Sequence, residues 1–429
     1  LCFKILIMLK VYFKQALNLL KQNKLISIVS IAGTALAIMM IMVIILTEQV
    51  KVVNIAPEPN RDKSLYLTLM TVNSKVNSWS HGNPPEYEIY HDYLSQMETP
   101  ELISAMYYDK FVIKSDKSKE YLNALTRLVD ANYWKIVSLD FIDGTFFNDA
   151  EFEAGMHYVV VSESIANKLF GSENVVGETL EIEAIPFKII GVVKNVIPTF
   201  STAYADIWIP YVANDYYEDE YYDIVFLTKD KKDFPLIIEE LDDIVRQFDL
   251  ENDEWKISFE GPHTHRANVY AAGEWDLNEP VEKANRRTIL MFVILLLVPA
   301  LNLSNFNISQ IRKRFEEIGI RRAFGATKSK ILMQVLSENF LCSLIGGVIG
   351  LISSFLVVLL MKDWLMGLEY WYLEGMTGVE TIPIQALISI PVFLGVFIIC
   401  IVFNLLSAFV PAYKASKIVI VDSINQNEN

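Results

Sequence analysis

Four long apolar runs constrain the fold of this 429-residue chain more than any other feature. A helix needs about 20 apolar residues to cross the hydrocarbon core of a bilayer. Four stretches reach that length without a charged residue: Leu25 to Leu46, Thr288 to Ile308, Phe340 to Met361, and Ala386 to Val410. The sequence therefore predicts a membrane protein with one span near the N-terminus and three spans toward the C-terminus.

The first run stands where a secretory signal sequence would stand. Its uncharged stretch is longer than the roughly 7 to 15 residues of a signal core, and no small-residue cleavage site follows before Glu48. We interpret the run as a retained anchor. Ahead of it, apolar residues at helical spacing oppose lysines, which predicts an amphipathic helix in contact with membrane lipid. This pattern begins near Met8, the expected start of translation, so that residues 1–7 would be an upstream extension.

Charge differs sharply between the segments that the spans separate. Residues 48–285 carry 20 Lys/Arg and 43 Asp/Glu, whereas the rest of the chain is net basic. Basic residues near span ends mark the cytoplasmic side. They precede the first span and fill the loop between the second and third spans, and they outnumber Arg286 and Arg287, which oppose this orientation. Both termini are expected in the cytoplasm, with residues 48–285 and the loop 362–385 outside.

The acidic outer segment is long enough for a domain with its own core. Strand-like pieces alternate with helical ones, which predicts an α+β fold. The expected strands are Leu65 to Thr71, Lys110 to Ile113, Tyr158 to Val161, Phe187 to Val193 and Asp206 to Ile209. The expected helices lie near Glu88 to Met97, Ser162 to Phe170 and Leu236 to Phe248.

Two features of the outer segment have the residue types of an ion site. His263 and His265 would share one side of a strand, but no Cys, His or carboxylate stands nearby at a ligand-like spacing. The acidic run from Asp215 to Asp223 is more typical of a solvated loop than of a calcium site. No metal, cofactor or disulfide is expected in this segment, since the three cysteines, Cys2, Cys342 and Cys400, lie outside it.

The sequence lacks the common motifs of hydrolytic chemistry. It contains no G-x-x-x-x-G-K-[ST], no H-E-x-x-H and no G-x-S-x-G. The spans also lack the series of acids and bases that a proton-driven carrier needs. We expect a non-catalytic protein without a nucleic-acid partner, and any energy for transport must come from another chain.

A short basic segment between the second and third spans is the most informative part of the chain. A helix that shows Arg321 and Arg322 can end at Gly325, where a left-handed C-cap needs no Cβ. Thr327 can then N-cap the helix that returns into the membrane. Such a hairpin could dock into a groove of another protein, or it could be a basic loop that only fixes orientation.

The run E-I-G-I-R-R-A-F-G-A-T from Glu317 to Thr327 resembles the signature of the FtsX/MacB-type permeases of ABC transporters. Further matching positions are Asn305, Gln334, Glu338, Gly346, Gly347, Gly350 and the segment from Pro411 to Ile418. Ile420 departs from the pattern, because a proline is usual there.

The outer segment resembles the MacB-type periplasmic core. The matching pieces are Asn132 to Trp134, Gly144 to Phe147, Val160 to Gly171, Val176 to Gly177 and Ile190 to Val193. Thr145 replaces the arginine that is usual beside Gly144. The resemblance leaves out about residues 55–125 and 212–285, where a preference for substrate or partner would be encoded.

The resemblance implies a permease of the bacterial inner membrane that pairs with a second copy, identical or paralogous, and with a separate ABC ATPase. A periplasmic adaptor or an outer-membrane channel is a further expected partner. ATP-driven motion would pass from the hairpin to the outer domain, as mechanotransmission in export. One alternative is a regulatory FtsX-like protein that controls an extracytoplasmic hydrolase or a signalling partner. Another is a membrane scaffold without an ATPase.

The resemblance also assigns roles to single residues. ATPase docking is assigned to Glu317, Ile318, Gly319, Ile320, Arg321, Arg322, Ala323, Phe324, Gly325, Ala326 and Thr327. A coupling or structural role is expected for Glu338, Asn305, Pro299, Gly346 and Gly350. The expected segments are an amphipathic helix at 1–24, spans at 25–47, 286–308, 338–361 and 386–410, an outer domain at 48–285, a cytoplasmic hairpin at 309–337, an outer loop at 362–385 and a tail at 411–429.

Overall fold

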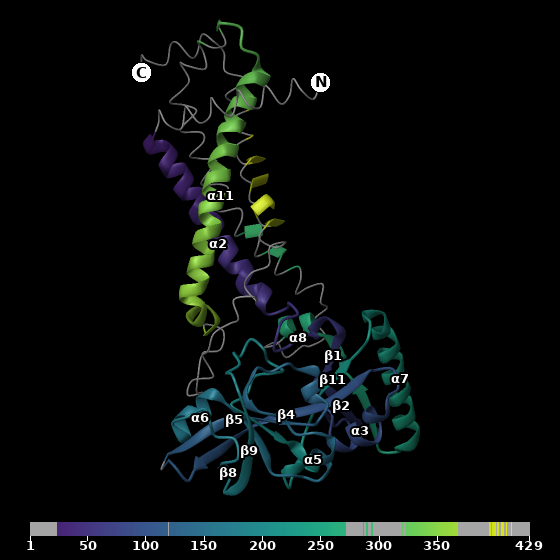
Figure 1. Ribbon diagram of the computed structural model, residues 1–429. Coiled ribbons are helices and arrows are strands. Elements are labelled where there is room, and N and C mark those ends of the chain that lie inside the picture. Colours follow the sequence, from purple (N-terminus) through teal and green to yellow (C-terminus); the bar gives the residue numbers. More distant parts are fainter. Residues whose placement is uncertain are drawn as a thin grey trace. The chain divides into compact units, whose positions relative to one another are not determined.

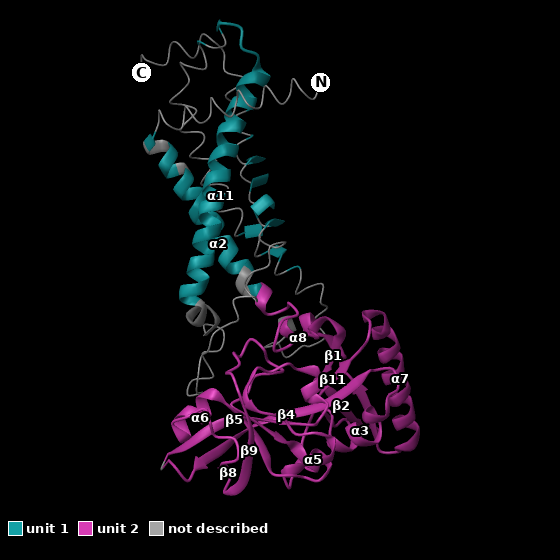
Figure 2. Ribbon diagram, in the orientation of Figure 1, with its two compact units in different colours: residues 1–48, 285–362, 387–429 teal, residues 49–284, 363–386 magenta. Residues whose placement is uncertain are grey.

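The computed structural model forms two compact units, shown in two colours in Figure 2. One unit contains residues 1–48, 285–362 and 387–429, and the other contains residues 49–284 and 363–386. The structure describes residues 24–118, 120–271 and 323–367, together with positions 286, 289–290, 293–294, 320, 394–395, 397–399, 401–402, 405–406, 409 and 413. The expected amphipathic helix before residue 24 and most of the expected spans at 286–308 and 386–410 lie outside these residues.

Two long helices dominate the described part of the first unit: α2 (Lys24–Val50) and α11 (Lys328–Gly367) (Figure 1). Ser27–Val50 and Lys328–Met361 are long and apolar enough to cross a membrane. Helix α11 continues past Met361, the expected end of its span, to Gly367. Two of the four expected spans thus correspond to described helices, and the count of four stays a prediction.

Helices α2 and α11 approach each other closely at two glycines of α11. A Cβ on Gly346 would lie 2.8 Å from the carbonyl oxygen of Ile31, and one on Gly350 would lie 2.6 Å from that of Ala35. Neither position has room for a side chain. Small residues at such positions let the backbones of membrane helices approach closely. Gly33 of α2 differs, because nothing lies within 4 Å of its Cβ position. The close contact at Gly346 and Gly350 is therefore made within one chain.

The second unit is built on a ten-stranded mixed sheet. Its strand order is β13-β1-β11-β4-β5-β10-β7-β9-β6, and β8 pairs with both β4 and β9. The pairs β10–β5 and β7–β9 are parallel. The strands are β1 (Ser64–Leu67), β4 (Leu102–Ser115), β5 (Tyr121–Val129), β6 (Phe141–Gly144), β7 (Tyr158–Ser162), β8 (Thr179–Ile182), β9 (Ile185–Val193), β10 (Ile207–Pro210), β11 (Asp223–Leu227) and β13 (His263–Thr264).

A separate three-stranded sheet has the order β12-β2-β3. Its strands are β2 (Met70–Ser74), β3 (Ser80–Asn83) and β12 (Trp255–Phe259). The prediction of one strand from Leu65 to Thr71 is wrong, because the structure has two strands there. The chain leaves β1 after Leu67 and enters β2 at Met70, so the two halves of the expected strand belong to different sheets.

Helices of the second unit pack on these sheets, and α6 and α7 lie toward opposite ends of the large sheet in Figure 1. The helices are α3 (Tyr87–Asp92), α4 (Tyr133–Ile136), α5 (Asp149–Glu153), α6 (Glu163–Phe170), α7 (Phe234–Glu251) and α8 (His265–Ala271). Helix α6 begins where the Ser162 Oγ accepts a hydrogen bond from the Ile165 N–H. Helix α7 buries Ile237, Leu241 and Ile244 against the core. The expected α+β class of the outer domain is confirmed.

Candidate functional site

The turn that precedes α11 is the first part of the candidate site. The Phe324 N–H donates to the Ile320 carbonyl at 3.1 Å, and Gly325 follows with φ +89°. That conformation suits glycine, which has no Cβ to strain. The Thr327 Oγ1 then accepts a hydrogen bond from the Lys330 N–H at 3.4 Å where α11 begins. A helix end and a capped helix start therefore meet within a few residues, as the sequence predicts.

The described residues of this turn expose apolar surface. Phe324 is 88% exposed and Ile320 is 58% exposed. Further along α11, the Gln334 Nε2 donates to the Glu338 Oε1 at 3.2 Å, so Glu338 has a neighbour on its own helix. Among the residues expected to act here, Glu317, Ile318, Gly319, Arg321 and Arg322 lie outside the described part of the chain, as do Pro299 and Asn305.

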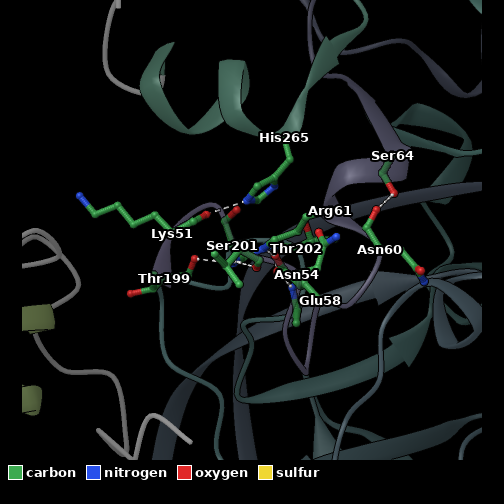
Figure 3. A network of polar contacts seen from close by, with 12 residues as sticks. Lys51, Asn54, Glu58, Asn60, Arg61, Ser64, Thr199, Ser201, Thr202 and His265 are labelled. Carbon is green, nitrogen blue, oxygen red and sulfur yellow. Dashed lines mark hydrogen bonds and ion pairs between the residues drawn. The ribbon is translucent and has the colours of Figure 1, made fainter. Parts of the chain in front are cut away.

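A buried polar cluster surrounds Arg61 within the second unit (Figure 3). We call it the Arg61 junction. It consists of Val50, Lys51, Val53, Glu58, Arg61, Thr199, Thr202, Ala203 and His265.

Arg61 satisfies its guanidinium almost entirely with fixed oxygens. Its Nη1 donates to the carbonyls of Val50 at 2.7 Å and Val53 at 3.1 Å, and its Nη2 donates to that of Thr199 at 3.2 Å. The Phe200 ring lies 4.7 Å from the guanidinium carbon. The last carbonyls of a helix lack partners within the helix and attract positive charge. Arg61 therefore caps the C-terminus of α2 from a buried position.

Glu58 balances the buried charge and holds a second segment. Its Oε2 accepts from the Arg61 Nε at 2.7 Å, and both side chains are almost fully buried. Its Oε1 accepts from the backbone N–H groups of Thr202 at 2.8 Å and Ala203 at 2.9 Å. One carboxylate thus joins the arginine to the loop that leads into β10.

His265, the first residue of α8, completes the junction. Its Nε2 lies 2.9 Å from the Lys51 carbonyl oxygen. A carbonyl can only accept, so Nε2 carries the proton, and Nδ1 is buried with no partner among the described residues. Burial, and secondly the charge of Arg61, lower the pKa of His265 below its usual value. The imidazole is therefore neutral at neutral pH.

The loop at residues 199–204 connects the junction to the centre of the sheet. The Tyr133 hydroxyl donates to the Thr202 carbonyl at 3.1 Å and accepts from the Trp208 Nε1 of β10 at 3.1 Å. Arg127 of β5 holds the same loop through the carbonyls of Ser201 and Tyr204. Within the second unit, hydrogen bonds therefore connect the Val50 carbonyl through Arg61 and the loop 199–204 to the core of the outer domain.

Two sequence motifs that lie apart in the chain meet in an aromatic cluster. Trp134 of α4 stacks on Phe146 at 5.5 Å and contacts Phe147 edge-on at 5.4 Å. Gly144 stands beside them with φ +73°, and a Cβ there would collide with the Ile190 carbonyl. The pieces at 132–134, 144–147 and 190–193 are thus neighbours in the fold.

Neither of the two possible ion sites has the geometry considered from sequence. His263 and His265 do not share a strand, because β13 ends at Thr264 and His265 begins a helix. The described residues contain no group of three or more His, Cys, Asp or Glu side chains placed to hold a metal. The acidic run is not simply a solvated loop, since Tyr222 within it is fully buried among Tyr87, Tyr90, Tyr107 and Tyr211.

Residues 25–244 match the family described as the MacB-like periplasmic core domain, and residues 289–420 match the FtsX-like permease C-terminal domain. The first match spans more than half of the chain. The chain belongs to the MacB-like periplasmic core domain family. The resemblance to FtsX/MacB-type permeases of ABC transporters, predicted from the sequence, is confirmed.

The curated relatives that resemble this chain include proteins named as an ABC transporter permease and as export ATP-binding/permease proteins. An uncharacterized ABC transporter permease, YknZ of Bacillus subtilis, is 25% identical over 313 residues, which cover 71% of each chain. The pyoverdine export ATP-binding/permease protein PvdT of Pseudomonas entomophila is 26% identical over 292 residues, 65% of this chain but 39% of PvdT. A crystal structure of the extracellular domain of YknZ from Gram-positive bacteria matches 45% of this chain and 99% of that domain, with 16% identity and a TM-score of 0.35.

The Arg61 junction was not found from the sequence. Its ion pair, Glu58 and Arg61, lies in the stretch from about residue 55 to 125, where the family resemblance gives no residue assignments. The available signal was a Glu and an Arg three residues apart, Glu58 and Arg61, directly after an apolar span. That pattern alone is common on exposed turns, so burial of the pair could only come from the structure.

Proposed function

We propose that this chain is the membrane subunit of a bacterial ABC exporter, and that it transmits motion from a separate ATPase to its outer domain. The observation that carries the proposal is the order of parts. A MacB-like core follows an apolar helix, and an FtsX-like permease segment follows the core. The chain itself has no nucleotide-binding loop of the Walker A type.

The ATPase would bind at residues 317–327. Support comes from the exposed Phe324 and Ile320, since aromatic and apolar anchors carry most of the binding energy at protein interfaces. Arg321 and Arg322 would add charge complementarity to this surface. In this arrangement four spans cross the inner membrane, both termini and the hairpin face the cytoplasm, and two permease copies flank the ATPase.

Purification of the intact complex tests the proposal. The full chain, with an affinity tag at its C-terminus, is isolated from its own bacterium in mild detergent, and the partners are identified by mass spectrometry. We expect an ABC ATPase and a second permease copy, together with an adaptor or an outer-membrane channel. A cell-wall hydrolase or a sensor kinase in place of the channel would favour the regulatory alternative.

The matched control is the same chain with Arg321→Glu and Arg322→Glu. These changes reverse the charge of the expected docking surface while leaving the outer domain untouched, so the ATPase should be lost and the second permease copy retained. A complex without any nucleotide-binding subunit, or one that this variant leaves intact, would contradict ATPase docking at the hairpin.

A further inference from the structure

The described segment 49–271 of the second unit begins and ends near one edge of the large sheet. The chain enters from α2 through residues 51–63 into β1, and it leaves through β13 into α8. Strands β1 and β13 pair side by side, with Tyr66 opposite His263. Segments separated by about two hundred residues of sequence, 51–66 and 263–265, are therefore neighbours.

The Arg61 junction ties these two connections to each other and to the sheet. Arg61 donates to the carbonyls of Val50 and Val53, and His265 donates to that of Lys51, so two side chains hold three carbonyls of the entry segment. Glu58 and Arg61 both form hydrogen bonds with the backbone of the loop at 199–203. This loop is anchored to β10 through Tyr133 and Trp208.

Stability alone does not account for a cluster of this composition. Replacing a buried ion pair by apolar residues of similar volume is often neutral or stabilising, because desolvation offsets the attraction between the charges. A planar guanidinium that donates to several acceptors fixes the positions of those acceptors relative to one another. The partners here are main-chain carbonyls of a connection, whose position would otherwise be free to vary.

We propose that the Arg61 junction is a rigid joint within the second unit, which fixes residues Val50 to Val53 and the first turn of α8 to the sheet of the outer domain. A displacement of either connection then moves the sheet as well, instead of only changing the backbone conformation of residues 51–60. Arg61 and Glu58 act as positioning residues in this transmission. The inference rests on the proposed function for the source of the motion, whereas the rigidity of the joint can be measured independently.

The test uses the full-length complex with two spin labels inside the outer unit. Val52→Cys places one label on the entry segment and Ser172→Cys places the other on an exposed loop after α6, in a chain with Cys2→Ser, Cys342→Ala and Cys400→Ala. Pulsed electron paramagnetic resonance gives the distribution of distances between them. The joint is loosened by Glu58→Gln with Arg61→Gln, which leaves no unpaired buried charge and keeps an acceptor at residue 58.

Arg127→Gln is the matched control. Arg127 is also a buried arginine and holds the same loop through Ser201 and Tyr204, but its hydrogen bonds do not reach residues 49–63. We expect a narrow distance distribution in the parent and in Arg127→Gln, and one at least twofold broader in the double variant. Equal widths in all three proteins, or equal broadening by both variants, would overturn the joint.

Arg61→Lys covers the case in which the double variant does not fold. A lysine keeps the charge but cannot hold the carbonyls of Val50, Val53 and Thr199 together. The amides of Val52 and Val53 both donate to the Gln49 carbonyl, and their hydrogen exchange should become at least tenfold faster. Unchanged exchange would overturn the proposal.

The link to function is measured on the same complexes as the ATP-dependent change in hydrogen exchange of the outer domain. The parent and Arg127→Gln should respond to ATP, while the double variant should hydrolyse ATP within about twofold of the parent rate and lose the response. A parent that does not respond would overturn the proposed function, whereas a responding double variant would overturn the role of the joint.

Discussion

At the scale of single residues, the guanidinium of Arg61 shows how far burial changes the consequence of a substitution. Arg61→Gln alone leaves the Glu58 carboxylate buried without its counter-charge, which costs about 3–5 kcal/mol of unfolding free energy. Glu58→Gln with Arg61→Gln should cost clearly less, because no unpaired charge remains. Chemical unfolding of the full chain in detergent, followed through the tryptophan signal, gives both values. Equal costs would show that the pair does not act as a unit.

His265 predicts a dependence of stability on pH. Its pKa is lowered in the folded state by burial and by the charge of Arg61, so the unfolded state binds a proton more readily. The stability contributed by neutral His265 is complete above the unfolded pKa of about 6.5. It is lost as pH falls below that value toward the lowered pKa of the folded state.

His265→Gln isolates this effect, because the glutamine amide can still donate to the Lys51 carbonyl without titrating. Asp130 changes stability in the opposite direction on acidification. Burial raises its pKa to about 6, so the folded state becomes more stable as that carboxyl is protonated. The quantity to compare is therefore the difference in melting temperature between parent and variant at pH 7.5 and at pH 5.5. The parent should lose more than the variant on acidification. An identical loss would contradict a neutral, buried His265.

Single residues were predictable where local chemistry decides their role. Gly325 and Thr327 lie at a helix end and a helix start, and both roles follow from backbone conformation and one hydrogen bond between residues close in sequence. Arg61 was not predictable, because its partners at Val50 and Thr199 are set by how distant segments pack. Sequence spacing carries no information about that packing.

At the scale of elements, the contact between α2 and α11 makes glycines in similar apolar sequence differ in how well they tolerate a side chain. Gly350→Leu should cost about 1–3 kcal/mol, because its Cβ would press on the Ala35 carbonyl of α2. Gly33→Leu should be close to neutral, since nothing lies within 4 Å of its Cβ position. Thermal unfolding of the two variants in the same detergent measures this difference. Equal destabilisation would contradict the packing of α2 on α11.

Substitution in the turn before α11 is expected to weaken binding of the ATPase. Phe324→Asp replaces an exposed aromatic side chain in the expected docking surface and should weaken retention of the ATPase at least about tenfold, equivalent to about 1.4 kcal/mol. Tyr216→Asp is the control, because Tyr216 is an exposed aromatic residue in the outer domain. Quantitative mass spectrometry of the purified complexes measures retention. Equal ATPase content in both variants would argue against docking at this turn.

Elements were predictable in proportion to the length and clarity of their patterns. Helix α6 follows from its N-cap Ser162 and helix α7 from its apolar periodicity. Helix α7 buries Ile237, Leu241 and Ile244, whereas Leu236 of the same apolar stripe is exposed. The strand expected from Leu65 to Thr71 proved to be two strands, because Thr68 and Leu69 carry no turn signal that marks a change of sheet. Strand β13, only His263–Thr264, is too short for any pattern and exists through its pairing with β1.

At the scale of the whole molecule, the division into an apolar part and an acidic outer part was evident from charge and hydropathy alone. The two compact units follow the same division along the chain. The meeting of the entry segment with β13 at one sheet edge was not evident, since it depends on the pairing of β1 with β13.

In the proposed function, ATP hydrolysis on one side of the membrane changes the outer domain on the other side. The direct measurement is hydrogen exchange of residues 49–271 in proteoliposomes that hold the purified complex, with ATP supplied only on the side of the hairpin or only on the side of the outer domain. We predict a change in exchange only when ATP is on the hairpin side and the ATPase subunit is present. No change, or a change that ATP on the outer side also produces, would contradict the account.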